Sequence, residues 1–411
     1  MARKYASEVA GQRSSAPALT PPPGNPRFPL FDGLRAIAAL SVLVFHAAFY
    51  SRAMEGDRRF SPYLAHLNVG VAVFFLISGF LLYRPLVAAR IGDGPPVRLR
   101  DYLRRRALRI IPAFWIALTV LAIYPGLPNM FSGNWLAYYG FAQGYSRSTV
   151  LGGIGPAWTL DAEVVFYLLL PVLSLAFARA AGRVGRDAWW QFELAALALL
   201  VGGSVAFRLY ARTHPSVPSS TFASTFGWFA LGMALALGSA LWASRRSPWV
   251  DRVARYSWLG WIAAAGAYVV LCRGLGLGGG FLFFQRESAA QSIEIYALSG
   301  VVAAGVALPA VLEPERARRP LGRFLASPPL AWLGLVSYGI YLYHEPIARS
   351  LNGGVNGGAD RTVRFLWLAP ATTALAIAAA ALSYYVVERP ALRFKDRRRA
   401  RPARRARVGS T

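Results

Sequence analysis

Arg35 and His46 lie in one stretch, RAIAALSVLVFH, that is otherwise apolar and long enough to belong to a membrane-spanning helix. An ionisable side chain at bilayer depth costs roughly 2.5–3.5 kcal/mol on insertion scales, so it normally persists where it faces a bundle interior or a watery cavity and has a function. Positions 35 and 46 are eleven residues apart, almost three helical turns, which predicts both side chains on one helix face about 16 Å apart along the axis. The pair is therefore a candidate functional site.

The composition indicates the scaffold that must position this pair. Hydrophobic residues make up 55% of the 411 residues and charged residues only 16%, and apolar runs of about 20 residues recur along the whole chain. We therefore expect an all-α fold, a polytopic bundle of transmembrane helices. The ten expected spans lie near residues 29–51, 68–89, 107–125, 158–178, 190–210, 223–243, 256–273, 290–312, 328–350 and 365–388.

The strongly basic balance, a formal net charge of +26, would also suit a nucleic-acid-binding protein. Its distribution argues against that class, because with the amino terminus inside most Lys and Arg fall on the inner loops, tails and inner helix ends. We therefore expect both termini in the cytoplasm and no nucleic-acid partner. Most of these charges are explained by topology and by attraction to anionic lipid.

The chain divides into three expected parts. Residues 1–27 are rich in Pro, Ser and Ala, which predicts a disordered cytoplasmic arm. Residues 28–390 form the membrane domain, and residues 391–411 form a basic cytoplasmic tail. Since no soluble domain of useful size separates or follows the spans, any chemistry must be done within the membrane bundle.

Further ionisable residues fall inside other expected spans. In the predicted topology His344 lies in the outer part of the ninth span, and Glu163 lies near the outer end of the fourth, one turn before Tyr167 on the same face. Three separate segments thus bring His46, His344 and Glu163 to a similar depth. On the inner side, Arg106 and Arg109 are three residues apart, a spacing that places two guanidinium groups side by side for phosphate.

Each of these residues also has a structural interpretation. A histidine in a span can cap a neighbouring carbonyl, Glu163 can complement a helix dipole, and the arginines can be plain topogenic charge. A serine acyl-enzyme through Ser78 or Ser337 is conceivable, although small residues in SGF and SYG better suit helix packing. The single cysteine, Cys272, rules out an internal disulfide, and the four histidines lack ligand spacing, so we expect no metal.

Six segments together carry a resemblance to a known family. The chain resembles the acyltransferase family 3, bacterial integral-membrane enzymes that acylate sugars, envelope glycans and macrolide-type natural products. Each segment is weak alone, but their shared order is specific. The matching segments are FDGLRAIAALSVLVFHAAF, GVAVFFLISGFLL, YLRRRALRIIPAFW, PAWTLDAEVVFYLLLP, SYGIYLYHEP and SYYVVERPALRF. Ala72 departs from the pattern, because many members carry a polar or acidic residue there.

The resemblance implies a membrane O-acyltransferase of the bacterial inner membrane. Its donor would be an acyl-CoA, most simply acetyl-CoA, and its acceptor a hydroxyl of a sugar, glycan or macrolide-type product. His46 and Arg35 would be the matched functional pair, with His46 as general base and Arg35 either binding CoA or holding charge that develops on the thioester oxygen. Apart from the resemblance, the carboxylate of Glu163 is a further candidate catalytic residue, which would orient the imidazole or help the acceptor. We expect the donor to contact five residues, which are Arg105, Arg106, Arg109, Tyr167 and His344.

Two other functions remain open at this point. A proton-coupled transporter of a glycan precursor or natural product could use the same buried His, Arg and Glu residues. A membrane sensor or scaffold with a degenerate site is a third hypothesis. The absence of an evident inverted repeat argues against the transporter, and the intact Arg35 and His46 pair argues against degeneracy.

Overall fold

The computed structural model describes residues 28–55, 59–92, 97–185, 188–214, 218, 220–244, 248–274, 288–312, 320–353 and 360–394. Over these ranges the chain forms helices and no strands, which confirms the expected fold class. The long helices are α2 (Leu30–Tyr50), α4 (Gly70–Ile91), α5 (Leu99–Ile123), α7 (Trp158–Val184), α8 (Trp189–Thr213), α9 (Phe222–Ser244), α11 (Leu259–Arg273), α12 (Ala289–Leu312), α14 (Pro328–Gly353) and α15 (Arg361–Ser383).

Shorter elements connect these helices. They are α3 (Ser61–Ala65), α6 (Trp135–Tyr139), α10 (Pro248–Arg255), α13 (Pro320–Leu325), α16 (Arg389–Arg393), a π-helical turn (Tyr384–Glu388) and the 3-10 turns η1 (Ala53–Glu55), η2 (Leu67–Val69), η3 (Gln143–Tyr145) and η4 (Gly155–Ala157). The expected amino-terminal arm and residues 395–411 of the expected tail lie outside the described residues.

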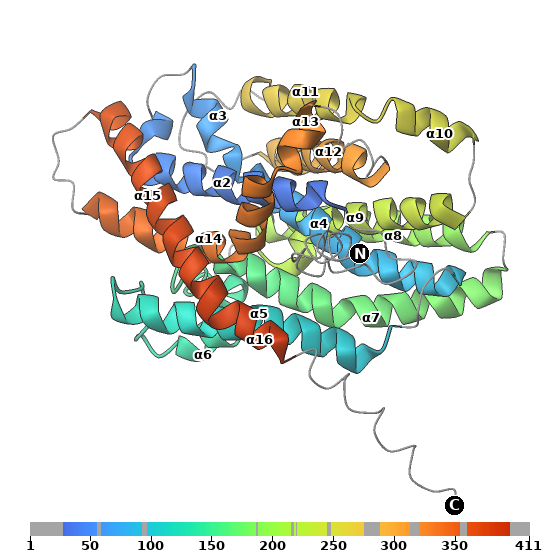
Figure 1. Ribbon diagram of the computed structural model, residues 1–411, viewed down its shortest axis with the longest axis horizontal. Coiled ribbons are helices and arrows are strands. Elements are labelled where there is room, and N and C mark those ends of the chain that lie inside the picture. The colour runs from blue at the N-terminus through green and yellow to red at the C-terminus, as the bar shows by residue number, and fades with distance from the viewer. Residues whose placement is uncertain are drawn as a thin grey trace, which may run out of the picture.

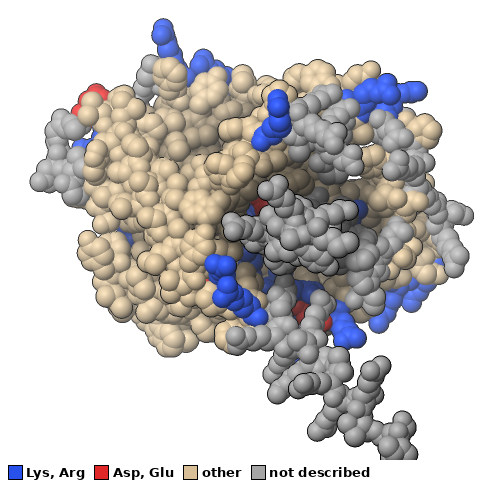
Figure 2. All heavy atoms as spheres, viewed as in Figure 1, with Lys and Arg blue, Asp and Glu red and all other residues tan. Residues whose placement is uncertain are grey.

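Each of the ten expected spans corresponds to one long helix. Among the described residues, eight helical segments are long and apolar enough to cross a membrane. The other two are α11, which has only 15 residues, and α14, which carries His344 and Glu345 among several tyrosines. Uncharged side chains cover most of the described surface on the face shown in Figure 2. The chain is therefore a multi-pass membrane protein.

The central part of the bundle is formed by α2, α4 and α14. Helix α14 packs along α2 on one side and against α15 on the other, while α4 packs along α9. Figure 1 shows α15 crossing α14 obliquely, with α5 and α7 lying together on the opposite side of the bundle from α11. The residues at positions 35 and 46 both lie on α2, which is among the more enclosed helices of the fold.

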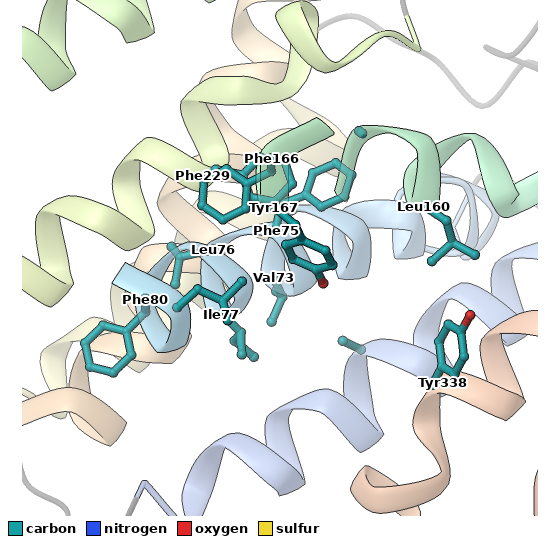
Figure 3. Packing of buried hydrophobic residues seen from close by; sticks show 14 of the residues in the cluster. Val73, Phe75, Leu76, Ile77, Phe80, Leu160, Phe166, Tyr167, Phe229 and Tyr338 are labelled. Atoms are coloured by element: carbon teal, nitrogen blue, oxygen red, sulfur yellow. The ribbon is translucent and has the colours of Figure 1, made fainter. Parts of the chain in front are cut away.

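Stacked aromatic rings fix the contact between α4, α7 and α9. The ring of Phe229 lies 4.4 Å from that of Phe75 and 4.3 Å from that of Phe166, measured between centroids, and all three side chains are buried. Figure 3 shows them meeting from three different helices. Such offset aromatic contacts contribute about 0.5–1.5 kcal/mol each beyond their buried area.

Two glycines allow α4 and α9 to approach closely. A Cβ atom added at Gly79 would lie 2.2 Å from the carbonyl oxygen of Phe229, and one added at Gly232 would lie 2.0 Å from that of Leu76. Small residues at such crossings let helix backbones touch in membranes. The SGF segment on α4 therefore serves helix packing through its glycine.

We expect Gly232→Ala to lower the stability of the folded bundle by about 1–3 kcal/mol, because the new methyl group must push α9 away from α4. The matched control is Gly238→Ala on the same helix, where an added Cβ meets nothing within 4 Å. Thermal unfolding of the purified proteins in detergent compares the two. Equal unfolding midpoints would contradict the close approach.

Candidate active site

The two histidines from different helices are in direct contact. His344 Nε2 lies 3.1 Å from His46 Nδ1, although the two residues are far apart in the sequence. His46 Nδ1 also lies 2.9 Å from the carbonyl oxygen of Val42. His344 is fully buried, whereas His46 keeps some accessible surface. The structure thus brings together His46 and His344, as their predicted depths suggested.

The hydrogen-bond partners define the tautomers of this pair. His344 Nδ1 faces the carbonyl oxygens of Ile340 and Tyr341, at 3.1 and 2.9 Å, so Nδ1 must carry the proton and Nε2 must accept. His46 Nδ1 then faces two acceptors and must be the protonated nitrogen. The remaining nitrogen, Nε2 of His46, has a free lone pair and no partner among the described residues. This is the arrangement that a general base requires.

A second polar group lies beside the histidines at the same end of α2. Tyr50 donates a hydrogen bond to Oε1 of Glu345, whereas Oε2 of Glu345 is buried without a hydrogen-bond partner among the described residues. Nη1 of Arg349 lies 3.8 Å from Oε1 of Glu345, and Nη2 of Arg349 donates to the carbonyl oxygen of Gly126 at 3.1 Å. A Cβ atom at Gly155 would lie 3.5 Å from the Glu345 carboxyl carbon. The connection between α5 and α7 therefore covers this end of the site.

The structure gives Glu163 other hydrogen-bond partners than the histidines, which were expected at a similar depth. Thr159, in the first turn of α7, donates to the hydroxyl of Tyr341 at 3.0 Å, and Tyr341 lies one turn before His344. Glu163 lies one turn further along α7, within electrostatic reach of both Tyr341 and Tyr338. Among the described residues, no hydrogen bond joins its carboxylate to either histidine.

Hydrogen bonds and charge place Glu163 with the arginines instead. Its carboxylate accepts from Ser78 and from Tyr167, each at 2.7 Å. Arg35 is within electrostatic reach of Glu163 and of Arg109. Glu163 is therefore part of the site around Arg35, and no hydrogen bond links it to His46 among the described residues.

Three arginines and two tyrosines form this second part of the site, which we call the arginine cluster: Arg35, Arg106, Arg109, Tyr102 and Tyr167. The guanidinium of Arg106 lies 5.9 Å from the centre of the Tyr167 ring, and that of Arg35 lies 6.0 Å from the ring of Phe74. The Nε atoms of Arg35 and Arg106 are buried and have no hydrogen-bond partner among the described residues. Unused donors on converging cations suit a multiply charged anion such as a phosphate.

Helix α5 begins eight residues before its expected span, at Leu99 rather than residue 107, and this difference positions the arginines. Arg105 and Arg106 are consequently helical, and they are half-buried, as is Arg109 within the expected span. The hydroxyl of Tyr338 on α14 donates to the carbonyl oxygen of Ile110 at 3.0 Å, which joins α5 to the central helices. The arginine pair is therefore drawn into the bundle, next to Arg35.

The structure assigns simpler contacts to several other candidates. Ser337 donates to the carbonyl oxygen of Gly334 within its own helix, and Asp161 accepts from the backbone amide of Gly144. His344 is enclosed by α2 and α14, so it contacts His46 and leaves no surface for a donor. In the part of the chain that is described, no group of three His, Cys, Asp or Glu residues is arranged to hold a metal ion.

Sequence reasoning missed three site residues: Tyr50, Glu345 and Glu388. Glu388 ends the π-helical turn, is 1% exposed, and lies within electrostatic reach of Arg109 and Arg35. The signal that identifies Arg35 and His46, an ionisable residue in an apolar helix, also applies to Glu345 and Glu388. Tyr50 lacks such a signal, because tyrosine is common at the ends of membrane helices.

Three curated proteins with similar sequences match most of this chain. Peptidoglycan O-acetyltransferase OatA of Listeria monocytogenes is 26% identical over 384 residues, which cover 88% of this chain and 55% of that protein. Acyltransferase MdmB of Streptomyces mycarofaciens is 28% identical, with 92% and 95% covered, and nodulation protein 10 of Rhizobium leguminosarum is 27% identical, with 89% and 93% covered. The chain therefore spans about half the length of the Listeria protein and nearly all of the other two.

No solved structure matches the chain at a significant level. None of these relatives is named as a transporter, so the comparisons give no support to that alternative. A family profile described as an acyltransferase domain matches residues 29–385, a range that contains both histidines and the whole arginine cluster. The chain belongs to this family, the membrane acyltransferases of acyltransferase family 3.

Proposed function

We propose that the protein transfers an acyl group from an acyl-CoA, most simply acetyl-CoA, to a hydroxyl group of a sugar, glycan or macrolide-type acceptor. The observation that carries this proposal is that the site has two ends. Unused guanidinium donors lie at one end, and an imidazole with a free Nε2 lies at the other. The two ends are joined along α2, from Arg35 to His46, a distance of about 16 Å.

The arginine cluster is the proposed binding site for the donor. Phosphate groups of CoA would contact Arg35, Arg106 and Arg109, where charge-assisted hydrogen bonds satisfy the free donors. The extended pantetheine arm would then run along α2 and bring the thioester to His46. Because Arg35 lies far from the histidines, its position supports donor binding rather than stabilisation of charge on the thioester oxygen.

Glu163 and Tyr167 belong to the same donor site in this proposal. Glu163 accepts from the hydroxyl of Tyr167, and Arg106 lies over the ring of that tyrosine. The carboxylate thereby orients the ring of Tyr167, against which the guanidinium of Arg106 lies. It also balances part of the positive charge of Arg35. Glu163 is a positioning residue here rather than a partner of the base.

His46 is the proposed general base. An acceptor hydroxyl is a poor nucleophile at neutral pH, so its proton must be removed as its oxygen attacks the thioester carbonyl carbon. His46 Nε2 takes that proton, the new C–O bond forms, and the C–S bond breaks. The proton then passes from His46 to the departing thiolate of CoA, which leaves the base ready for another turnover.

His344 holds the imidazole of His46 in the tautomer that this step needs. We expect His344→Leu to lower kcat by about 100-fold and to leave the affinity for CoA unchanged, because the arginine cluster is untouched. The loss is expected to be smaller than the roughly 10⁴-fold seen when a charged orienting carboxylate is removed. The Val42 carbonyl still holds His46 Nδ1. Steady-state rates and CoA titrations check the two quantities; weaker CoA binding with normal kcat would contradict this role.

In the proposed topology, the two ends of the site lie toward opposite sides of the membrane. With both termini in the cytoplasm, α2 runs outward, so the arginine cluster faces the compartment in which CoA is made. His46 then lies in the outer half of the inner membrane of a bacterial cell. The basic α5 segment on the inner side supports this orientation.

The relatives suggest the class of acceptor. One is named for peptidoglycan O-acetylation, and the chain matches the full length of an acyltransferase from an organism of the genus Streptomyces. The first name fits a hydroxyl-bearing glycan as the acceptor, and the second fits acyl transfer without naming an acceptor.

The direct test is the release of CoA thiol from acetyl-CoA by protein purified in detergent, with and without added hydroxyl acceptors. We expect release to depend on a hydroxyl-bearing acceptor and the acyl group to appear on it as an ester. A protein that binds no acyl-CoA of any chain length would contradict the proposal.

A further inference from the structure

Glu388 is a buried carboxylate that the proposed reaction does not use. It is 1% exposed, and neither of its oxygens has a hydrogen-bond partner among the described residues. Burying an unpaired carboxylate is costly unless nearby positive charge offsets the loss of hydration. Arg109 and Arg35 lie within electrostatic reach and offset part of that cost. The carboxylate therefore faces the same cations that would bind the donor phosphates.

The local backbone keeps Glu388 in this position. It ends a π-helical turn, Tyr384–Glu388, that interrupts the helical run between α15 and α16. Turns of this kind are rare and often mark functional sites. The turn packs against α5, and Arg104 on α5 donates to the carbonyl oxygen of Phe394 at 2.6 Å, just after α16. The segment that carries Glu388 is thus tied to the helix that carries Arg109.

The two other acids near Arg35, Glu163 and Asp32, differ from Glu388 in their hydrogen bonds or their exposure. Both oxygens of Glu163 accept hydrogen bonds, from Ser78 and Tyr167, and Asp32 is exposed. Glu388 differs from both because it is buried and its oxygens are free of hydrogen bonds within the described residues. Among the described residues, Glu388 therefore interacts with the arginine cluster through its charge and not through hydrogen bonds.

We propose that Glu388 is a counter-charge that balances the arginine cluster while the donor site is empty and that competes with the phosphates of CoA. The inference rests on the proposed function, because it assumes that the cluster binds CoA. In the empty site Arg35 and Arg109 repel each other, and the Glu388 carboxylate attracts both. When phosphate groups arrive, they face the same negative charge, which weakens binding and speeds the departure of the CoA product.

The experiment measures CoA binding to the full-length protein by isothermal titration in detergent. Glu388→Gln removes the charge and keeps the shape, and Glu388→Asp keeps the charge. The control is Glu55→Gln, which removes an acid that pairs with Arg52 and Arg361 outside the cluster. We expect Glu388→Gln to bind CoA about tenfold more tightly than the parent, whereas Glu388→Asp and Glu55→Gln stay within about twofold of it.

Kinetics and a double variant separate this role from a structural one. In Glu388→Gln the KM for acetyl-CoA is expected to fall together with kcat, since tighter product binding slows turnover. The effect on CoA affinity is expected to shrink when Arg109→Gln is also present, because the two changes act on one interaction.

The outcomes distinguish this inference from the proposed function. Equal or weaker CoA binding in Glu388→Gln, with normal binding by the parent, overturns the counter-charge and leaves the acyltransferase proposal intact. Failure of the parent itself to bind CoA overturns the proposed donor and the counter-charge together. Thermal unfolding of each variant verifies that the proteins compared are folded.

Discussion

Replacing His46 with alanine is expected to reduce acyl transfer by about 10³-fold while CoA binding stays at the parental level. A positioned base contributes roughly 10²–10⁴-fold to such reactions, and the structure provides no second imidazole with a free nitrogen at this place within the described residues. His344 is a poor substitute, because its side chain is fully buried and its accepting nitrogen, Nε2, faces the position of His46. The measurement pairs steady-state acetyl transfer with CoA titration of the same preparation.

The matched control for this variant is His214→Ala. His214 is exposed at the end of α8 and stacks on the ring of Tyr210, outside the site. It should lose no activity. If His46→Ala kept more than about a tenth of the parental rate, His46 would not be the base. If it lost CoA binding instead, the division of the site into two ends would be wrong.

Replacing Arg35 with glutamine is expected to weaken CoA binding by about 10- to 100-fold, because a charge-assisted hydrogen bond to phosphate contributes about 1.5–3 kcal/mol. At saturating donor the rate should stay close to that of the parent. This split between KM and kcat separates the proposed role from stabilisation of a developing oxyanion, which would lower kcat at any donor concentration. Arg35→Lys should retain part of the affinity, since it keeps the charge and loses the planar fork.

Arg252→Gln serves as the control for Arg35→Gln. Arg252 is exposed in the last turn of α10, so its loss removes one positive charge outside the cluster. It should change CoA affinity little. An Arg35→Gln variant with normal CoA affinity and a large fall in kcat would contradict the proposed role in donor binding. It would instead assign Arg35 to the chemical step.

The helices could be predicted from the sequence because bilayer depth imposes a simple requirement. Backbone polar groups in lipid must bond within the same helix, so each apolar run of about 20 residues has to form one. Charged residues in those runs are costly, which is why Arg35 and His46 on α2 could be chosen as functional residues from their types alone. Counting spans placed His46 and His344 at a similar depth, and the structure then showed that the two side chains are in contact.

The pairing of side chains could not be predicted in the same way. Glu163 accepts from Ser78 on α4 and from Tyr167 on its own helix, a set of partners that depends on how α7 packs against α4 and leaves no periodic pattern in the sequence. Which acid faces the arginines depends on the rotation of the chain at the π-helical turn that ends in Glu388. Both arise from packing between helices, so they became visible only in the structure.

A structure of the protein with bound CoA, determined by cryo-electron microscopy, tests the central claim most directly. We predict phosphate density against Arg35, Arg106 and Arg109, and the CoA sulfur close to Nε2 of His46. CoA bound away from the arginine cluster, or with its sulfur remote from His46, would contradict the two-ended site and the mechanism built on it.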